Sequence, residues 1–237
     1  MRLAHLLCDD GITGELWLGA LVDAGAEPST LQAAIDSAGV EARIVAERRD
    51  AREVVATYVS LEEPAGAAHV RSVAELRARI EAAGLSGRTL SRASAVAEAL
   101  ARAEASSHGV GLGDVKFHEL ARPRGVARIL AGAVALEELK IDQVSVGSVN
   151  VGGGMIEMSH GRFPVPPPAV LHLLAAFTIY GDRREDELTT PSGAAVLAGL
   201  AEQRLAIPSM RLERHGRGAV ERDGRSRLLT LLIGSVD

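Results

Sequence analysis

The pattern of apolar and polar residues along the chain predicts strands and helices that follow one another closely. Residues 3–7 are apolar and precede two glycines, which is typical of a strand that ends in a turn. Apolar residues then recur at helical spacing over 16–24, and a second amphipathic helix is predicted over 31–38, ending near Gly39. The chain therefore begins with a strand, a glycine turn and helices.

The next part of the chain changes from strand-like to helical patterning. Residues 42–61 are rich in Val, Ile, Tyr and Thr around a charged stretch at 48–53, which predicts a strand pair joined by an exposed turn. The segment 62–71 is interpreted as a mobile linker because it begins with acidic residues, proline and glycine. Helical periodicity then covers 72–107 and is broken only at 84–87.

The remaining pattern again mixes strands and helices. Glycine and proline dominate 152–168, where an irregular region is expected. The predicted regular elements are a strand at 115–117, a helix over 125–139, a strand over 143–151, a helix over 169–176, a helix opened by Thr190 and Pro191, and strands near 209–215 and 228–233. This order predicts an α/β fold of mixed strands and helices, in one compact domain or two tightly packed lobes.

Composition narrows the choice of partners. Hydrophobic residues make up 47% of the chain and aromatic residues only 3%, which favours helices packed on strands through small side chains. The net charge is -5 and the basic residues are dispersed, so nucleic acid is not expected as a partner. The start does not read as a signal peptide, and no run approaches the roughly 20 apolar residues that cross a bilayer, so no membrane partner is expected. A single cysteine excludes an intramolecular disulfide and favours a cytoplasmic location.

Polar residues gather among glycine or proline in short segments that could carry chemistry. These segments are, in chain order, 8–15, 108–119, 152–168 and 187–195. The first segment follows a predicted strand and precedes a helix, where α/β proteins bind ligands and helix amides can hold an anion. Gly11, Thr13 and Gly14 are therefore candidate ligand-binding residues, with a plain strand-to-helix turn as the alternative.

The second segment places His118 directly before Glu119, with His108 at the segment's start. Neutral imidazole binds nickel and zinc, and an adjacent carboxylate can orient the ring, bind the metal or accept a proton. The three residues are candidates for catalysis, and His118 also for metal binding. A hydrogen-bonded structural pair is the alternative interpretation of the His118–Glu119 dipeptide.

For the other two segments and the single cysteine, a binding role and a purely structural role are both possible interpretations. Gly153 would let the backbone approach a ligand, and His160 would bind a metal, unless this region is only a stiff connection that contains a cis peptide. Thr190 and Ser192 could hold phosphate, although helix capping explains most of their pattern. Cys8 would be a metal ligand if a helix amino terminus stabilised its thiolate, and otherwise an inert buried thiol.

In this order the segments resemble the amino-terminal part of the LarC-like nickel-insertion proteins, which load nickel into a pyridinium bisthiocarboxylate nucleotide to make the nickel-pincer cofactor. The matching runs are Leu7-Cys8-Asp9-Asp10-Gly11-Ile12-Thr13-Gly14-Glu15, His108-Gly109-Val110, Phe117-His118-Glu119, residues 160–169 and residues 187–195. The resemblance covers about residues 2–234 and implies that 1–237 is one LarC-like amino-terminal-type domain. It implies that Cys8, His108, His118, Glu119 and His160 surround nickel and the cofactor precursor.

The chain also departs from this pattern. The family typically has two aspartates at the start of the helix after Phe-His-Glu, where this chain has Arg124 and Arg128. Residues four apart lie on one helix face, so with Arg122 these side chains form a surface suited to carboxylate or phosphate. They would repel a cation by on the order of 1–4 kcal/mol per charge. Of the family's histidine-rich linker, only His69 remains.

Full-length members continue into a carboxyl-terminal nucleotide-binding domain, which is absent from these 237 residues. The resemblance therefore implies CTP and manganese as cofactors only if a separate nucleotide-binding subunit supplies that domain. Nickel remains the expected metal, and a nucleotide-like or anionic small molecule the expected ligand. Whether the chain forms a homo-oligomer stays open.

The leading hypothesis is a nickel-insertion protein or metallochaperone for a nickel-pincer nucleotide, with nickel chelatase activity of the lyase class if it is an enzyme. The alternative is a metal-independent enzyme on the same scaffold, in which arginines 124 and 128 anchor an anionic molecule while His118 and Glu119 perform acid–base chemistry. A third hypothesis is a non-catalytic assembly subunit.

Overall fold

The structure is a computed structural model that describes residues 1–117, 122–158, 161–222 and 224–236. Its first elements are, in chain order, β1 (Arg2–Cys8), α1 (Gly14–Asp23), α2 (Pro28–Ser37), β2 (Arg43–Ala51), β3 (Val54–Glu62), α3 (Val73–Ala82), α4 (Gly87–His108) and the short helix η1 (Leu112–Asp114). The elements that follow are α5 (Pro123–Glu138), β4 (Gln143–Asn150), β5 (Met155–Met158), β6 (Gly161–Pro164), α6 (Pro168–Leu173), β7 (Ile179–Tyr180), α7 (Pro191–Leu200), β8 (Ala201–Gln203), β9 (Arg211–Arg222) and β10 (Arg225–Ser235).

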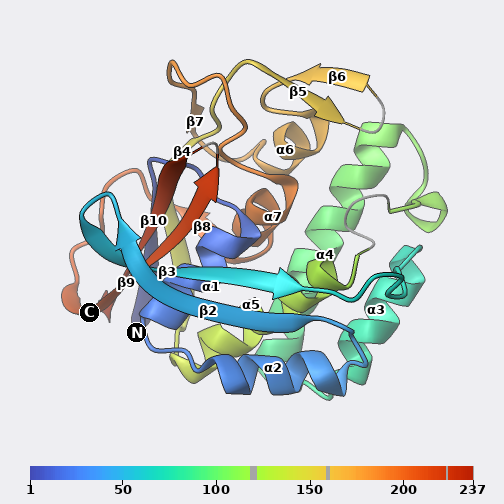
Figure 1. Cartoon of the computed structure of the whole chain (residues 1–237), viewed down its shortest axis with the longest axis horizontal. Helices are drawn as coiled ribbons and strands as arrows, with labels where there is room; N and C mark the ends of the chain where they lie inside the picture. The colour runs from blue at the N-terminus through green and yellow to red at the C-terminus, as the bar shows by residue number, and fades with distance from the viewer. Residues whose placement is uncertain (118–121, 159–160, 223, 237) are drawn as a thin grey trace.

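An eight-stranded mixed sheet organises the described part of the chain, in the order β2-β3-β9-β10-β1-β4-β7, with β8 also paired to β4. The central strand β1 lies parallel to β4 and antiparallel to β10. Strands β7 and β8 pair with opposite ends of β4, both in parallel. Strands from the two ends of the chain are thus hydrogen-bonded side by side (Figure 1), and the predicted α/β class is confirmed.

Glycines bring helix α1 into direct contact with the sheet. A Cβ atom on Gly19 would lie 2.4 Å from the carbonyl oxygen of Thr57 in β3. A Cβ atom on Gly216 of β9 would lie 2.1 Å from the carbonyl oxygen of Ala20. Because neither position leaves room for a side chain, the backbone of α1 rests on the strands themselves. This close contact fixes the amino terminus of α1 at the carboxyl end of β1.

The core consists mostly of Ala, Leu, Val and Ile, as the composition predicts. Trp17 of α1 is its largest buried side chain, with 1% of its surface exposed. A Cβ atom on Gly132 of α5 would lie 2.7 Å from the indole nitrogen of Trp17, so α5 makes room for the ring by lacking a side chain there. None of the helices in the described ranges combines the length and the apolar run that a membrane crossing requires.

Most of the predicted elements are present, and two regional predictions are wrong. The strand pair is confirmed as β2 and β3, and the broken helical region as α3 and α4. The strand predicted at 115–117 is absent, because Val115 and Phe117 bury their side chains in the core without joining a ladder. The glycine- and proline-rich region contains the antiparallel pair β5–β6, since its glycines and prolines flank the pairing residues. The Val165–Pro166 peptide is cis.

The segment predicted to be a mobile linker connects β3 to α3 and makes specific contacts. The Glu63 carboxylate accepts a hydrogen bond from the backbone nitrogen of Arg124 (3.3 Å) and lies 3.1 Å from the Arg122 guanidinium. Val70, near the other end of the segment, is only 4% exposed. These contacts attach the segment to the start of α5 and to the core, while its mobility stays a prediction.

Candidate functional site

Three of the polar segments meet where the parallel strands β1 and β4 end. The Ile12 amide donates to the Thr189 hydroxyl (3.3 Å), and the Thr190 amide donates to the carbonyl oxygen of Ile12 (3.1 Å). The Leu188 amide donates to the carbonyl oxygen of Val151 (3.3 Å). The loop after β1 and the end of β4 are therefore both hydrogen-bonded to the segment around Thr189, and the three are locked together at one edge of the sheet.

The candidate glycines at this edge allow close approach between parts of the chain itself. Gly11 has a φ of +76°, and a Cβ atom there would lie 2.2 Å from the carbonyl oxygen of Leu188. The Cβ position of Gly14 is filled by the Arg128 side chain at 2.4 Å, and that of Gly153 lies 3.2 Å from the carbonyl oxygen of Arg184. These contacts give the glycines a packing role, and their contact with a ligand stays a prediction.

The candidate hydroxyl groups cap the helices that begin at this edge. Thr13 accepts a hydrogen bond from the Leu16 amide (3.1 Å) at the start of α1. Thr190 accepts from the Gly193 amide (3.4 Å) at the start of α7, and its hydroxyl lies 3.1 Å from that of Ser192. The amino termini of α1 and α7 thus lie together, which concentrates partial positive charge at the carboxyl ends of the strands. The predicted phosphate contacts of these hydroxyls remain to be tested.

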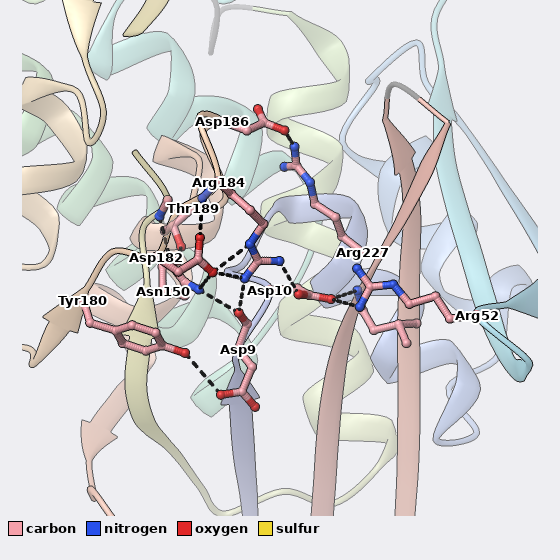
Figure 2. Close-up of polar contacts among 12 residues, drawn as sticks. Asp9, Asp10, Arg52, Asn150, Tyr180, Asp182, Arg184, Asp186, Thr189 and Arg227 are labelled. Atoms are coloured by element: carbon pink, nitrogen blue, oxygen red, sulfur yellow. Dashed lines mark hydrogen bonds and ion pairs between the residues drawn. The ribbon is translucent and has the colours of Figure 1, made fainter. Parts of the chain in front are cut away.

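An ion-pair network centred on the buried carboxylate of Asp10 lies beside these caps (Figure 2). The Asp10 side chain is 11% exposed and lies between two guanidinium groups, 2.5 Å from Arg184 and 2.9 Å from Arg52. Its second oxygen also accepts a hydrogen bond from the Leu228 amide (3.0 Å) in β10. One carboxylate therefore ties together the end of β1, the β2–β3 turn, the 182–188 loop and β10.

Arg184 extends the network toward β4 and β7. Its guanidinium donates to the Asp182 carboxylate and to the carbonyl oxygen of Asp9 (2.8 Å). The Asn150 amide group donates to the same two partners, Asp182 (2.7 Å) and the Asp9 carbonyl oxygen (2.9 Å). The Arg184 hydrogen bond holds the pKa of the Asp182 carboxyl well below its usual range. Burial and the nearby Asp9 carboxylate raise the pKa of Tyr180, whose hydroxyl donates to Asp9 (3.2 Å).

The depressed pKa of Asp182 predicts an acid-dependent contribution to stability. This contribution is present above the carboxyl's ordinary pKa of about 3.9 and is lost as the pH falls toward the lower pKa of the folded state. Urea unfolding between about pH 5 and pH 3 should show that Arg184→Gln loses less stability on acidification than the wild type. Arg183→Gln, a change at the exposed neighbouring arginine, should follow the wild type. Parallel pH dependence of the wild type and Arg184→Gln would refute the assignment.

The arginines that depart from the family pattern are engaged by acids of the same chain. Arg128 forms an ion pair with Glu15, and Arg122 pairs with Glu63. Arg124 contributes its backbone nitrogen to Glu63. Two of these guanidinium groups are therefore neutralised locally, which weakens the repulsion that they would exert on a cation.

Two of the candidates for metal binding and catalysis, Cys8 and His108, lie within the described residues, and their surroundings differ. Cys8 is 1% exposed within the hydrophobic core, and its burial, with Asp9 nearby, raises the pKa of the thiol. A high pKa disfavours the thiolate that binds a metal. His108 ends α4 with its ring 3.4 Å from the Glu104 carboxylate, one helical turn away. Both assignments stay predictions, and the geometry favours the inert reading of Cys8.

The burial of Cys8 predicts that the native protein resists alkylation. Iodoacetamide near pH 8 should leave the thiol unmodified over hours, because only the exposed thiolate reacts, and should modify it rapidly in denaturant. Intact mass spectrometry distinguishes the two outcomes. Rapid modification of the folded protein would show that the thiol is accessible and restore Cys8 as a ligand candidate.

The remaining candidates, His118, Glu119 and His160, lie outside the described residues. Within the described ranges, no group of three or more His, Cys, Asp or Glu side chains is placed to hold a metal ion. His69 and Lys116 line the same cavity of about 920 Å³, so the histidine of the 62–71 segment lies near the chain that leads into His118.

Sequence reasoning missed most of the buried polar network. Asp9 and Asp10 belong to the first polar segment, and their position directly after a strand was the available signal. Asn150, Arg184 and Arg227 were not singled out, although Asn150 and Arg227 are 1% and 5% exposed. Burial of polar residues depends on contacts between distant segments, which a single sequence does not display.

The fold and this edge define an α/β protein with a mixed sheet and a polar cluster at the carboxyl ends of parallel strands, the position where open α/β sheets bind ligands. A model of the nickel insertion protein family matches residues 4–235. The chain belongs to this nickel insertion protein family.

Curated relatives agree with this assignment. The chain is 32% identical over 237 residues to the pyridinium-3,5-bisthiocarboxylic acid mononucleotide nickel insertion protein of Thermotoga sp., covering 92% of this chain and 58% of the relative. It is 31% identical over 238 residues to the protein of the same name from Desulfitobacterium hafniense, covering 100% and 59%. A relative from Synechococcus elongatus is 37% identical over 240 residues, covering 99% and 60%. The chain thus spans less than two thirds of the length of these relatives, and no solved structure matches it.

Proposed function

We propose that this chain acts in nickel insertion into pyridinium-3,5-bisthiocarboxylic acid mononucleotide, the compound in the names of the Thermotoga and Desulfitobacterium relatives. The observation that carries the proposal is the family match over residues 4–235, which includes every polar segment of the site. The nickel ion and the mononucleotide are both substrates in this reading. The lyase class and a cytoplasmic location belong to the same proposal.

The residues that the resemblance places at the metal would divide the chemistry among them. His118 and His160 would bind nickel through neutral imidazole, Glu119 would orient a ring or accept a proton, and His108 would assist. Cys8 would join the ligands only if the metal displaced the proton that burial stabilises on its thiol.

The contacts of the arginines favour the nickel reading over an anion clamp made by the start of α5. Such a clamp needs free guanidinium groups, but Arg128 is bound to Glu15 and Arg122 to Glu63. Of these three arginines at the start of α5, Arg124 alone has a side chain without an ion-pair partner among the described residues. The metal-independent enzyme therefore loses one of its two proposed anchors.

The relatives are longer than this chain, so the proposal includes a second protein subunit. A separate nucleotide-binding subunit would supply what the rest of a relative supplies, and CTP and manganese would act there. This chain would bind the nickel and the cofactor precursor. The homo-oligomeric state and the number of subunits that cooperate are not part of the proposal.

Calorimetric titration of metal-free protein with nickel tests the proposal. The wild type should bind nickel, and His118→Ala should weaken the affinity by more than about 100-fold, because losing a direct ligand costs more than the roughly 10- to 100-fold effect of losing an outer-sphere partner. His172→Ala is the matched control, because His172 is an exposed residue of α6 and should leave nickel affinity unchanged.

Either of two results would argue against the proposal. A nickel affinity in His118→Ala equal to that of the wild type would move the metal elsewhere. A wild type that binds no nickel, but is stabilised against heat by anionic metabolites, would favour the metal-independent enzyme.

A further inference from the structure

A cavity of about 790 Å³ opens beside the Asp10 network, and its size is within the range of sites for small organic ligands. Strand β5, the loop that contains residues 184–188, the start of α7, the β2–β3 turn and the adjoining ends of β9 and β10 supply its walls. The walls thus come from widely separated parts of the chain. Among the residues that the structure describes, no predicted metal ligand lines this cavity.

The β9–β10 end of this cavity carries an excess of positive charge. Arg222 and Arg227 share one carboxylate, that of Asp186, with Arg222 at 3.6 Å and Arg227 in direct contact (Figure 2 shows the Arg227 pair). Arg225 is exposed and has no ion-pair or hydrogen-bond partner for its side chain among the described residues. Three guanidinium groups face one carboxylate, so this end of the cavity can accept a dianion.

Three other acidic residues, Glu157, Glu185 and Glu187, also line the cavity. Glu157 of β5 pairs with Arg162 at 3.7 Å, and Glu185 is exposed to solvent. The Glu187 carbonyl oxygen accepts a hydrogen bond from Arg227 (2.8 Å). Arg227 is only 5% exposed, and taking an arginine out of water is costly unless anionic partners surround it. A bound anion would add such a partner.

The β5 side of the cavity is apolar. Met155, Ile156 and Met158 line it together with Leu188, and Met155 is 47% exposed. Methionine packs favourably on aromatic rings because its thioether is flexible and polarisable. The cavity therefore combines a surface for a planar ring with a cluster of guanidinium groups.

We propose that this cavity binds a phosphorylated pyridinium nucleotide, with Arg222, Arg225 and Arg227 at the phosphate and the β5 methionines against the ring. Guanidinium groups suit this task because their planar donors match phosphate oxygens in bidentate pairs. The inference rests on the proposed function and deepens it by placing the phosphate end of the mononucleotide. It makes this cavity the precursor site, separate from the predicted phosphate contacts of Thr190 and Ser192.

Metal-free calorimetric titration with nicotinic acid mononucleotide tests this assignment, because that probe carries a pyridinium ring and a phosphate. The wild type should bind it, the riboside without phosphate should bind at least about tenfold more weakly, and inorganic phosphate should compete with the nucleotide. Arg225→Ser should also weaken nucleotide binding about tenfold, since a charge-assisted hydrogen bond is lost. The matched control is Arg211→Ser, at the opposite, exposed end of the same β9–β10 pair.

The outcomes separate this inference from the proposed function. Equal binding of nucleotide and riboside, wild-type affinity in Arg225→Ser, or no binding by the wild type would overturn the inference without touching the nickel titration. Nucleotide binding that follows the predicted pattern in a protein that binds no nickel would leave the cavity assignment standing and remove the proposed function. Thermal unfolding of Arg225→Ser should match the wild type, because the side chain has no described partner to lose.

Discussion

Replacing Gly218 by alanine is expected to destabilise the protein by about 3 kcal/mol, the upper part of the range for overpacked cores. A Cβ atom at Gly218 of β9 would lie 1.9 Å from the carbonyl oxygen of Leu16 and 2.6 Å from the amide nitrogen of Ala20. Both atoms belong to the backbone of α1, so rotation of a side chain cannot relieve the clash. The helix would have to move away from the sheet, and the contacts that place its amino terminus at the end of β1 would be lost.

Urea unfolding measures this effect, and the chain offers a matched control. Apart from its own turn, none of the described residues has an atom within 4 Å of a Cβ position at Gly113 in the short helix η1, so Gly113→Ala should change the free energy of unfolding by only a few tenths of a kcal/mol. If Gly218→Ala were as stable as Gly113→Ala, the direct contact between α1 and β9 would not exist as described.

Asp10→Ala is expected to cost about 2–4 kcal/mol of folding stability. The substitution removes the shared partner of Arg184 and Arg52 and leaves the Leu228 amide without its acceptor. Breaking a buried ion pair costs more than its net contribution, because the remaining charge stays partly desolvated. The estimate lies below the value for full burial because the Arg52 side chain is 49% exposed and can turn to water.

Chemical denaturation of Asp10→Ala and Asp36→Ala provides the comparison. Asp36 on α2 is exposed and accepts one hydrogen bond from Gln32 (2.7 Å), so its loss should cost less than about 1 kcal/mol. Equal stability of the two variants would show that the network around Asp10 contributes little.

The sequence predicted elements well wherever periodicity and local signals agreed. The helix opened by Thr190 and Pro191 is present because its cap depends on residues that are neighbours in the chain. The strand at 115–117 was wrong because a short apolar run does not reveal whether another strand lies beside it. Strand pairing is a property of distant segments, and the same limit hid the β5–β6 pair.

The candidate site was predicted in part. The segments around Gly11, Gly153 and Thr190, which were predicted to carry polar chemistry, meet at one edge of the sheet, and their chemistry stays a prediction. Their glycines, however, make room for neighbouring loops. The network of Arg184 and Arg227 was beyond sequence reasoning, since an arginine that is buried by tertiary contacts has the same local pattern as an exposed one.

The arginines at the start of α5 show how structure changes the meaning of a sequence difference. As isolated charges they argued against a bound cation. In the fold, Arg128 instead satisfies Glu15 in the first turn of α1, and its aliphatic part packs on Gly14. The excess guanidinium charge lies at the β9–β10 end of the neighbouring cavity, where a phosphate would need it.

The measurement that tests the central claim most directly is mass spectrometry of pyridinium-3,5-bisthiocarboxylic acid mononucleotide after incubation with this chain and nickel. The reaction would contain CTP, manganese and the carboxyl-terminal part of the Thermotoga relative, with the full-length relative as positive control. We expect nickel-containing nucleotide with the wild type and none with His118→Ala. Nucleotide that stays free of nickel with this chain, while the full-length relative loads it under the same conditions, would refute the proposed role in nickel insertion.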